Sequence, residues 1–244
     1  MITPHQLGNP LNSFTLICFA LKEEAAPFQK IAVGKAASTQ AVSILLTGIG
    51  RQNAEKSLRE FLATHSPNLV LTCGFAGGLN HELKLGAVVF EIHSSSSRCE
   101  SAQIKNGEKL EPTHVGCYEK LVAAGAKPAK LFCADRIATT VAEKKKLRDE
   151  TGADAVEMES SAIHAVCAEH GIPCVTVRVI SDTASEDLPL DFNALSKPDK
   201  NLDFGKLAWA IAKSPGKIGA LMELQKKTKF AAERLAIVLN KIIG

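Results

Sequence analysis

Residues 155–182 read AVEMESSAIHAVCAEHGIPCVTVRVISD and carry a strand–helix–strand pattern. Apolar residues, many of them β-branched, predict strands at Ala155–Met158 and Cys174–Ile180. Between them, Ser160–His170 has a helical period, and Gly171–Pro173 ends that helix just ahead of the second strand. A strand, a helix and a strand in this order predict a crossover unit on a parallel sheet.

The same alternation extends over most of the chain. Further strands are expected at Phe14–Leu21, Ala41–Thr47, Leu69–Cys73, Ala87–Ile92 and Lys130–Cys133. Further helices are expected at Glu23–Ile31, Arg51–His65 and Ala142–Glu150, with a helical tail from about residue 202 that is interrupted at Ser214–Gly216. No repeat or Ser/Gly-rich linker divides the sequence. We therefore expect an α/β fold: a three-layer α/β/α sandwich around a mostly parallel, twisted mixed sheet, as one domain over residues 1–244.

Composition excludes several classes of protein. The 244 residues are 45% hydrophobic and 23% charged, with a net charge of +3, which excludes collagen-like and disordered chains and gives no basic tract for nucleic acid. No apolar run approaches the roughly 18 to 20 residues of a membrane span. Residues 1–12 lack the pattern of a signal peptide, so a cytoplasmic protein is expected.

The cysteines and histidines carry no metal or disulfide pattern. The seven cysteines are odd in number and widely spaced, which favours reduced, buried thiols. The histidines show no HExxH or paired spacing, so no metal and no cofactor are expected. Residues 94–99, with four consecutive serines, have no clear period and are expected to form a surface loop.

Candidate ligand contacts follow the predicted strands, because ligands of open α/β sheets gather beyond the carboxyl ends of the strands. Glu24 follows the first strand. Gly50 and Arg51 follow the second, where amides at a helix start can hold an anion, although tight packing explains the glycine equally well. The stretch from Gly74 to Gly78 follows the third and is either a backbone wall for a flat ligand or a bulge at the sheet edge.

Carboxylates follow the last two strands. Glu157 and Glu159 are two residues apart at the end of an apolar strand, and Ser181–Asp182 ends another. Acidic groups at the end of a buried sheet are costly to desolvate, so they are either paired structurally or held for function. We expect Glu24, Glu159 and Asp182 to converge on one site.

Three stretches together resemble a known family. LLTGIGRQNAEKSL (45–58), LTCGFAGGLNHELKLGAVVF (71–90) and the segment 155–182 resemble the nucleoside phosphorylase superfamily, most closely its 5'-methylthioadenosine/S-adenosylhomocysteine nucleosidase branch. The resemblance implies a phosphorylase-like fold and a purine nucleosidase that cleaves the N-glycosidic bond of an adenosine-type nucleoside with a 5' substituent. It also implies a homo-oligomer, either a dimer or a trimer of dimers.

The resemblance assigns roles to the carboxyl groups. Asp182 would share its proton with N7 of the purine, Glu159 would bind the ribose 2' and 3' hydroxyls, and Glu24 would orient and deprotonate water. Ser181 and Arg178 would support Asp182. The remaining substrate contacts would be Met158 beneath the ribose, Glu157 beside it, Phe75, Ala76 and Gly77 along the glycine stretch, and Ile137 in place of an aromatic residue that stacks on the base.

Departures from the family leave alternatives open. Phosphorolytic members hold phosphate with an arginine and a small hydroxyl residue where this chain has Thr72 and Phe75, while Gly50 and Arg51 keep a phosphate site open. Residues 134–160 and 214–235 are similar to hopanoid-associated phosphorylases, which implies an adenosyl lipid substrate. A third alternative is a non-catalytic nucleoside-binding protein. His5 resembles a histidine that some phosphorylases lend to a neighbouring subunit, or belongs to a polar arm. The run Lys144–Lys146 is expected on the solvent face of a helix.

Overall fold

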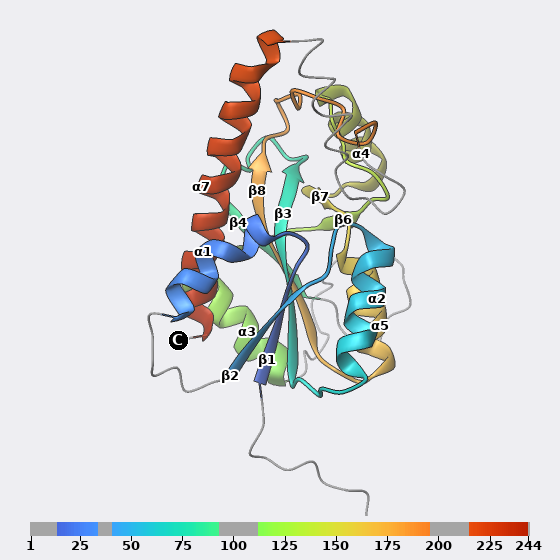
Figure 1. The fold of residues 1–244 in the computed structure, drawn as a ribbon, viewed down its shortest axis with the longest axis vertical. Helices are drawn as coiled ribbons and strands as arrows, with labels where there is room; N and C mark the ends of the chain where they lie inside the picture. The colour runs from blue at the N-terminus through green and yellow to red at the C-terminus, as the bar shows by residue number, and fades with distance from the viewer. Residues whose placement is uncertain (1–13, 34–40, 93–111, 196–214, 244) are drawn as a thin grey trace, which may run out of the picture.

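A mixed sheet lies between two layers of helices in the computed structural model, which describes residues 14–33, 41–92, 112–195 and 215–243 (Figure 1). Along the sheet the strands follow the order β2-β1-β3-β8-β4-β5, while β7 pairs with the end of β3 and β6 pairs with β7. The pairs β3–β7 and β4–β8 are antiparallel and the others are parallel. The strands are β1 (Phe14–Phe19), β2 (Ala41–Leu46), β3 (Leu69–Gly78), β4 (Val88–Ile92), β5 (Lys127–Pro128), β6 (Leu131–Cys133), β7 (Ala155–Glu157) and β8 (Cys174–Asp182). The predicted α/β fold with a mostly parallel mixed sheet is confirmed.

Helices cover both faces of this sheet. One face is covered by α1 (Lys22–Val33), α3 (Pro112–Ala123) and α7 (Ile218–Ile243), and the other by α2 (Arg51–Leu62) and α5 (Ser160–Glu169). Helix α4 (Val141–Thr151) lies beyond the end of the sheet, above β6 and β7 in Figure 1. A single 3-10 turn at Pro215–Lys217 precedes α7, as expected where Pro and Gly stand together.

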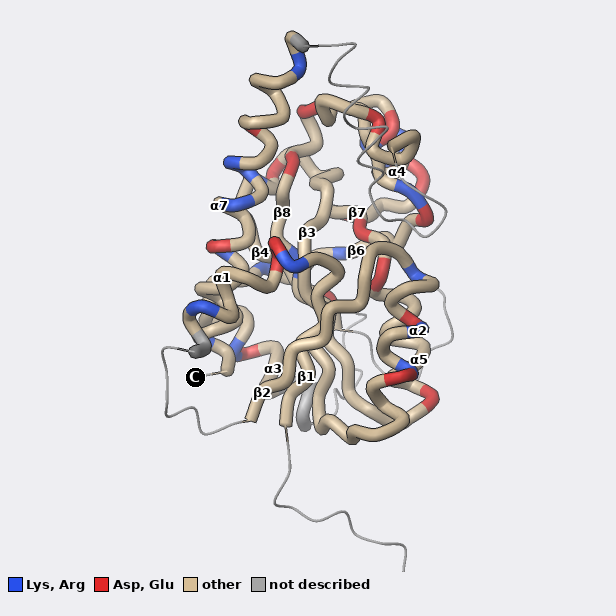
Figure 2. Tube along the Cα trace, viewed as in Figure 1, with Lys and Arg blue, Asp and Glu red and all other residues tan. Residues whose placement is uncertain are grey.

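Alternation along β1 explains how one strand serves two cores. Ile17 and Phe19 pack with α1 and α7, whereas Leu16 and Cys18 pack with α2 and α5. Because both faces are covered, the strand is mostly apolar, with Thr15 as its one polar residue. Figure 2 accordingly shows no charged residue along β1 or β2.

The third strand is longer than the sequence predicts. We expected it to end at Cys73, but β3 continues to Gly78 because the glycine stretch keeps pairing with β8 and then with β7. The register shifts where Ala76 lies opposite Ile180 and Gly77 lies opposite Asp182, so Ser181 is the extra residue of a bulge. The bulge therefore lies in β8, while the glycine stretch continues as strand in the interior of the sheet.

Other predicted elements end within a few residues of the observed ones, whereas α3 and the two-residue strand β5 were not predicted. Residues 94–99 and His5 lie outside the described residues, as does the part of the predicted tail before residue 215.

Within the described ranges, none of the helices has both the length and the apolarity that crossing a membrane requires. No group of three or more His, Cys, Asp or Glu side chains in these ranges is placed to hold a metal ion. The described cysteines are free thiols: Cys18, Cys73, Cys117, Cys133, Cys167 and Cys174.

Candidate functional site

The buried ionic groups of the described residues gather near the ends of β3, β7 and β8. The buried acidic side chains are Glu24, Glu157, Glu159 and Asp182, and the buried basic ones are Lys144 and Arg178. All four acids were singled out from the sequence, while Lys144 was not. They form two groups, each built around one cation.

The first group surrounds Arg178, a β8 residue that is 1% exposed. Its guanidinium forms an ion pair with Glu157, lies 3.6 Å from a carboxylate oxygen of Glu159 and donates to the Thr72 hydroxyl at 3.2 Å. Glu157 also accepts hydrogen bonds from the backbone and the hydroxyl of Ser160 at 2.9 and 2.6 Å. These contacts hold the Glu157 carboxylate in place and leave its side chain no exposed surface.

The pKa values of Glu157 and Glu159 shift in opposite directions although both carboxyl groups lie next to Arg178. Burial raises the pKa of Glu157, but Arg178 and the hydrogen bonds from Ser160 outweigh it, and the net shift is downward. For Glu159, burial raises the pKa to about 7, because the attraction of Arg178 is partly offset by repulsion from Glu157. Glu159 is thus the carboxylate of this pair that titrates near neutral pH.

Glu24 lies against the glycine stretch from the first turn of α1. Its carboxylate accepts hydrogen bonds from the amides of Phe75 at 2.8 Å and Leu21 at 2.9 Å. Burial raises its pKa, with these amides and Arg178 acting in the opposite direction. A buried carboxyl of this kind is a stronger base than an exposed one once it is ionised.

Gly74 makes this approach possible. A Cβ at this position would stand 2.7 Å from a carboxylate oxygen of Glu24 and 2.8 Å from a guanidinium nitrogen of Arg178. Its φ of +153° is also a conformation that other residues rarely adopt. The glycine therefore lets two charged groups lie directly against the strand.

The second group joins Asp182 and Lys144. The lysine ammonium lies 2.6 Å from one carboxylate oxygen of Asp182, and the hydroxyl of Ser181 donates to the other at 2.8 Å. A Cβ on Gly77 would lie 3.3 Å from the Asp182 carboxylate. Ser181 thus supports Asp182 as predicted, whereas Arg178 does not bind Asp182 and instead serves Glu157 and Glu159.

The prediction for the lysine run is wrong at one position. Lys144 is fully buried, while the side chains of Lys145 and Lys146 are 71% and 73% exposed and pair with acids one turn ahead. The signal was present: Lys144 is three residues from both Val141 and Leu147, so it shares the apolar face of α4.

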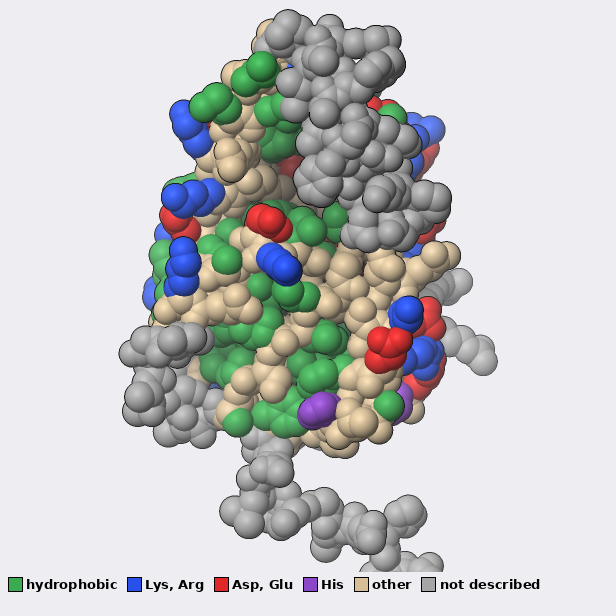
Figure 3. All heavy atoms as spheres, viewed as in Figure 1, with side chains coloured by type: hydrophobic (Ala, Val, Ile, Leu, Met, Phe, Trp, Pro, Cys, Tyr) green, Lys and Arg blue, Asp and Glu red, His purple; other side chains and the backbone are tan. Residues whose placement is uncertain are grey.

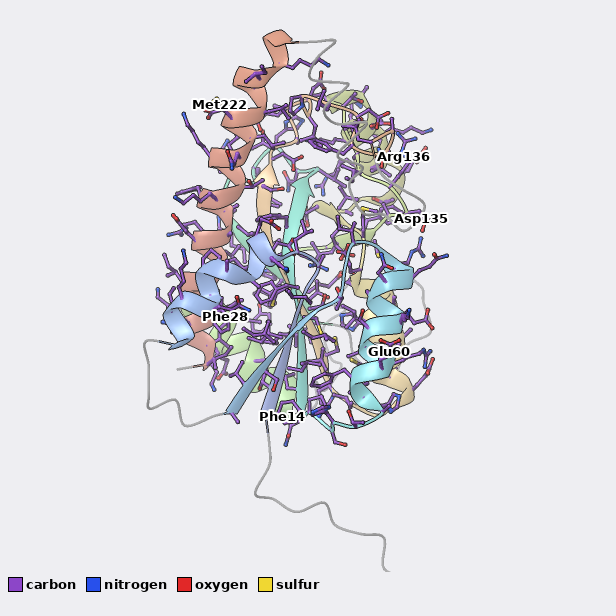
Figure 4. All side chains as sticks on the ribbon, viewed as in Figure 1. Phe14, Phe28, Glu60, Asp135, Arg136 and Met222 are labelled. Carbon is purple, nitrogen blue, oxygen red and sulfur yellow. The ribbon has the colours of Figure 1, made fainter. Side chains whose placement is uncertain are left out.

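The residues proposed for phosphate have other partners. The Gly50 amide donates to Glu159 at 2.8 Å, and Arg51 forms an ion pair with Asp135, whose side chain is 82% exposed. Figure 4 shows Asp135 and Arg136 at the outer edge of the molecule, away from the sheet. A phosphate at Gly50 would compete with a carboxylate for the same donor.

The remaining predicted contacts lie on segments next to these groups. Ala76 and Met158 are buried, whereas Phe75 and Ile137 are partly exposed. The side-chain amide of Asn193 bridges the backbone of Ile137, accepting from its N–H and donating to its C=O, both at 2.9 Å. This clamp was not predicted, since Asn193 and Ile137 are far apart in sequence. Contact of these residues with a substrate stays a prediction.

A family model described as the phosphorylase superfamily matches residues 8–95 and 126–213, which is more than half of the chain. The chain belongs to this superfamily.

Similar members of the phosphorylase superfamily include nucleosidases. A 5'-methylthioadenosine/S-adenosylhomocysteine nucleosidase of Shewanella halifaxensis (strain HAW-EB4) is 29% identical over 167 residues, which cover 62% of this chain and 73% of the relative. An enzyme of the same name from Bacillus cereus (strain B4264) is 28% identical over 167 residues, covering 62% of this chain and 72% of the relative.

Solved structures share the superfamily fold over nearly the whole chain. Futalosine hydrolase of Helicobacter pylori strain 26695 has a TM-score of 0.66 and 18% identity, covering 95% of this chain and 97% of its own. The Helicobacter pylori 5'-methylthioadenosine/S-adenosylhomocysteine nucleosidase with butyl-thio-DADMe-Immucillin-A has a TM-score of 0.66 and 17% identity, covering 96% and 98%. At these identities the likeness establishes the fold.

Proposed function

We propose that the protein is a purine nucleosidase that hydrolyses the N-glycosidic bond of an adenosine-type nucleoside with a 5' substituent, such as 5'-methylthioadenosine or S-adenosylhomocysteine. The nucleosidases among its relatives support this substrate class. The observation that carries the proposal is the excess of buried acid along the end of β3.

Charge accounting favours a cationic transition state. Glu24, Glu157, Glu159 and Asp182 face only two buried cations among the described residues, which leaves an excess of two negative charges when all are ionised. Such an environment stabilises positive charge that develops on a ribosyl ring as the bond to the base breaks. Burial strengthens the effect because solvent screens it less.

Each of three carboxyl groups has a role in this reaction. Glu159 anchors the sugar hydroxyls and provides negative charge near the ring, and its hydrogen bond from Gly50 holds its orientation. Glu24, fixed by the Phe75 amide, deprotonates the attacking water. Asp182 lies at the other end of the same glycine stretch and supplies the proton that the leaving base requires.

The same charges argue for water rather than phosphate as the nucleophile. A phosphate dianion would enter a region of negative excess in which Arg178 is already shared between Glu157 and Glu159. Lys144 has its ammonium directed at Asp182, and Arg51 pairs with Asp135 at the surface. None of these cations is available to a second anion without breaking an ion pair.

The test is product analysis with purified protein. We expect 5'-methylthioadenosine to give adenine and free methylthioribose at a rate that does not change when phosphate is added. Strict dependence on phosphate, with a ribose 1-phosphate product, would favour a phosphorylase. A 5'-alkyl adenosine with a long apolar chain, assayed beside it, tests the adenosyl lipid alternative. Thermal stabilisation by these nucleosides without any base release would leave only the non-catalytic binding protein.

A homo-oligomer, either a dimer or a trimer of dimers, remains part of the proposal. Figure 3 shows hydrophobic side chains gathered over the lower centre of this face, where Figure 1 shows β1 and β2. In the described sheet β2 is an edge strand, it carries no charge, and Leu46 at its end is 38% exposed. An uncharged edge of this kind favours association with another chain.

The free thiols fit the reducing environment of a cytoplasmic protein.

A further inference from the structure

We propose that Lys144 is the positioning residue of the base-side acid: it holds Asp182 in place and stabilises the carboxylate that remains after the proton has passed to the leaving base. This inference rests on the proposed function and adds a residue to it.

The ammonium group of Lys144 has no donor left for a substrate. Besides the 2.6 Å contact with Asp182, it donates to the carbonyl oxygens of Thr183 and Glu186, both at 2.8 Å. A lysine has three N–H donors, and three acceptors surround this one. Lys144 therefore acts through Asp182 and through the chain that follows it, and it does not touch the reacting atoms.

The location of Lys144 is unusual for a lysine, because burying an ammonium is costly unless a partner compensates it. Helix α4 presents two further lysines to solvent, so the chain has cations to spare on this helix without burying one. Replacing a buried ion pair by apolar residues is often neutral or stabilising, so stability alone does not account for this pair. A role in orienting Asp182 and stabilising its carboxylate form accounts for the buried pair.

Other charges near the pair are already balanced. Glu186, whose backbone carbonyl binds Lys144, pairs through its side chain with Lys227 of α7 at 3.0 Å. Glu143, the preceding residue of α4, belongs to a capping box with Thr140 and lies near Arg136. On the far side of the site Arg178 serves Glu157 and Glu159. Lys144 is thus the described basic side chain that forms an ion pair with Asp182.

The proton balance states what this cation does. In the proposed reaction the protonated carboxyl of Asp182 gives its proton to a ring nitrogen of the base, the bond between the sugar and the base breaks, and its electron pair stays on the base. Water supplies the hydroxyl of the sugar product, and its other proton is taken up by Glu24. Asp182 ends as a carboxylate, and a cation in contact favours that form. Lys144 therefore stabilises Asp182 in the form that remains after the proton has been given to the base.

The test is the pH profile of kcat/KM for Lys144→Met, which removes the cation, and Lys144→Gln, which also keeps a polar group that can reach the two carbonyls. In both variants we expect the high-pH limb of activity to move upward by about one to three pH units and the maximal rate to fall. Lys145→Met is the matched control from the exposed part of the run and should leave the profile unchanged.

The outcomes separate cleanly. If folded Lys144→Gln is less stable but its pH profile overlays that of the wild type, Lys144 is merely structural and the inference is wrong. If Lys144→Met does not fold, the glutamine variant decides. If the wild type itself releases no base from any adenosine-type nucleoside, the proposed function fails first, and these variants are not needed to show it.

Discussion

Each end of the candidate site contains one buried cation, but the number of carboxyl groups around that cation differs. At one end Arg178 lies among Glu157, Glu159 and Glu24, so negative charge is in excess. At the other end Lys144 pairs with Asp182 alone. The first arrangement leaves a carboxyl with a pKa near neutral, and the second balances its carboxyl with a dedicated cation.

This difference matches the charges that each end would meet in glycosidic cleavage. A sugar that becomes cationic is stabilised by uncompensated acid, whereas a group that gives up a proton is left negative and is stabilised by a cation. The two ends should therefore respond in opposite ways when one carboxyl is neutralised. Two substitutions test this directly, and two more test the residues that position the carboxyl groups.

The largest effect is expected for Asp182→Asn. The variant cannot donate a proton, so kcat should fall by about 10² to 10⁴ while nucleoside binding remains measurable. It also leaves the Lys144 ammonium buried without its counter-ion, which should lower the free energy of unfolding by about 3 to 5 kcal/mol. Base release and chemical denaturation measure the two effects.

Asp149→Asn is the control for this variant, since Asp149 pairs with Lys145 at the exposed surface. It should change neither quantity appreciably. Full activity of Asp182→Asn would remove the base-side acid from the proposal.

Glu159→Gln should reduce kcat by roughly 10² to 10³, because negative charge near the sugar is lost. Its effect on stability should have the opposite sign. A carboxyl with a pKa of about 7 when folded and 4.5 ordinarily costs stability as pH rises from about 4.5 to 7, and the full cost remains above pH 7. The variant should thus gain stability over the wild type across this range, reaching about 3 kcal/mol above pH 7.

Denaturation at pH 5, 6, 7 and 8 measures this gain, and Glu150→Gln, an exposed acid near Lys146, serves as the control. A variant that is less stable than the wild type at pH 8 would show that Arg178 needs the Glu159 charge, and the contrast between the two ends would fail.

Gly74→Ala tests the strand that separates the two groups. The new methyl group would press on Glu24 and Arg178, so we expect about 1 to 3 kcal/mol of destabilisation and a loss of kcat of at least about tenfold from the displaced base. Gly116→Ala on α3 is the matched control, because nothing lies within 4 Å of that position. Equal behaviour of the two variants would contradict the close packing at Gly74.

Ser181→Ala should have the smallest effect. It removes the hydroxyl that donates to Asp182 at 2.8 Å but leaves the lysine in place, so kcat should fall by no more than about tenfold. Ser57→Ala, which removes a 3.0 Å hydrogen bond to Thr47, is a comparable control. A loss as large as that of Asp182→Asn would mean that Ser181, and not Lys144, is the main support of the acid.

Sequence patterns were sufficient where burial is continuous. The strands β1, β2 and β8 follow from runs that are mostly apolar, although Thr15, Ser43 and Arg178 lie within them. The pattern failed at the end of β3, where glycines are typical of turns but here extend the strand between charged side chains.

The acids of the candidate site were predictable and the cations were less so. Strand-end positions and motif resemblance pointed to Glu24, Glu159 and Asp182, but the partner of Arg178 was assigned wrongly because pairing across strands depends on register. Lys144 was missed because three adjacent lysines are typical of a solvated helix face. Its spacing from Val141 and Leu147 indicates which lysine turns inward. That its ion-pair partner is Asp182 follows only from the fold.

The extra residue at Ser181 determines which residues flank the acid at the end of β8. In an uninterrupted strand, side chains 178, 180 and 182 would point the same way, but the shifted register sets Asp182 opposite Gly77 instead. Deleting Ser181, the single residue between Ile180 and Asp182, would leave the aspartate opposite Gly77 in an uninterrupted register and would remove the hydroxyl that donates to its carboxylate. The extra residue thus places a hydroxyl next to the acid without changing the position of Asp182 opposite Gly77.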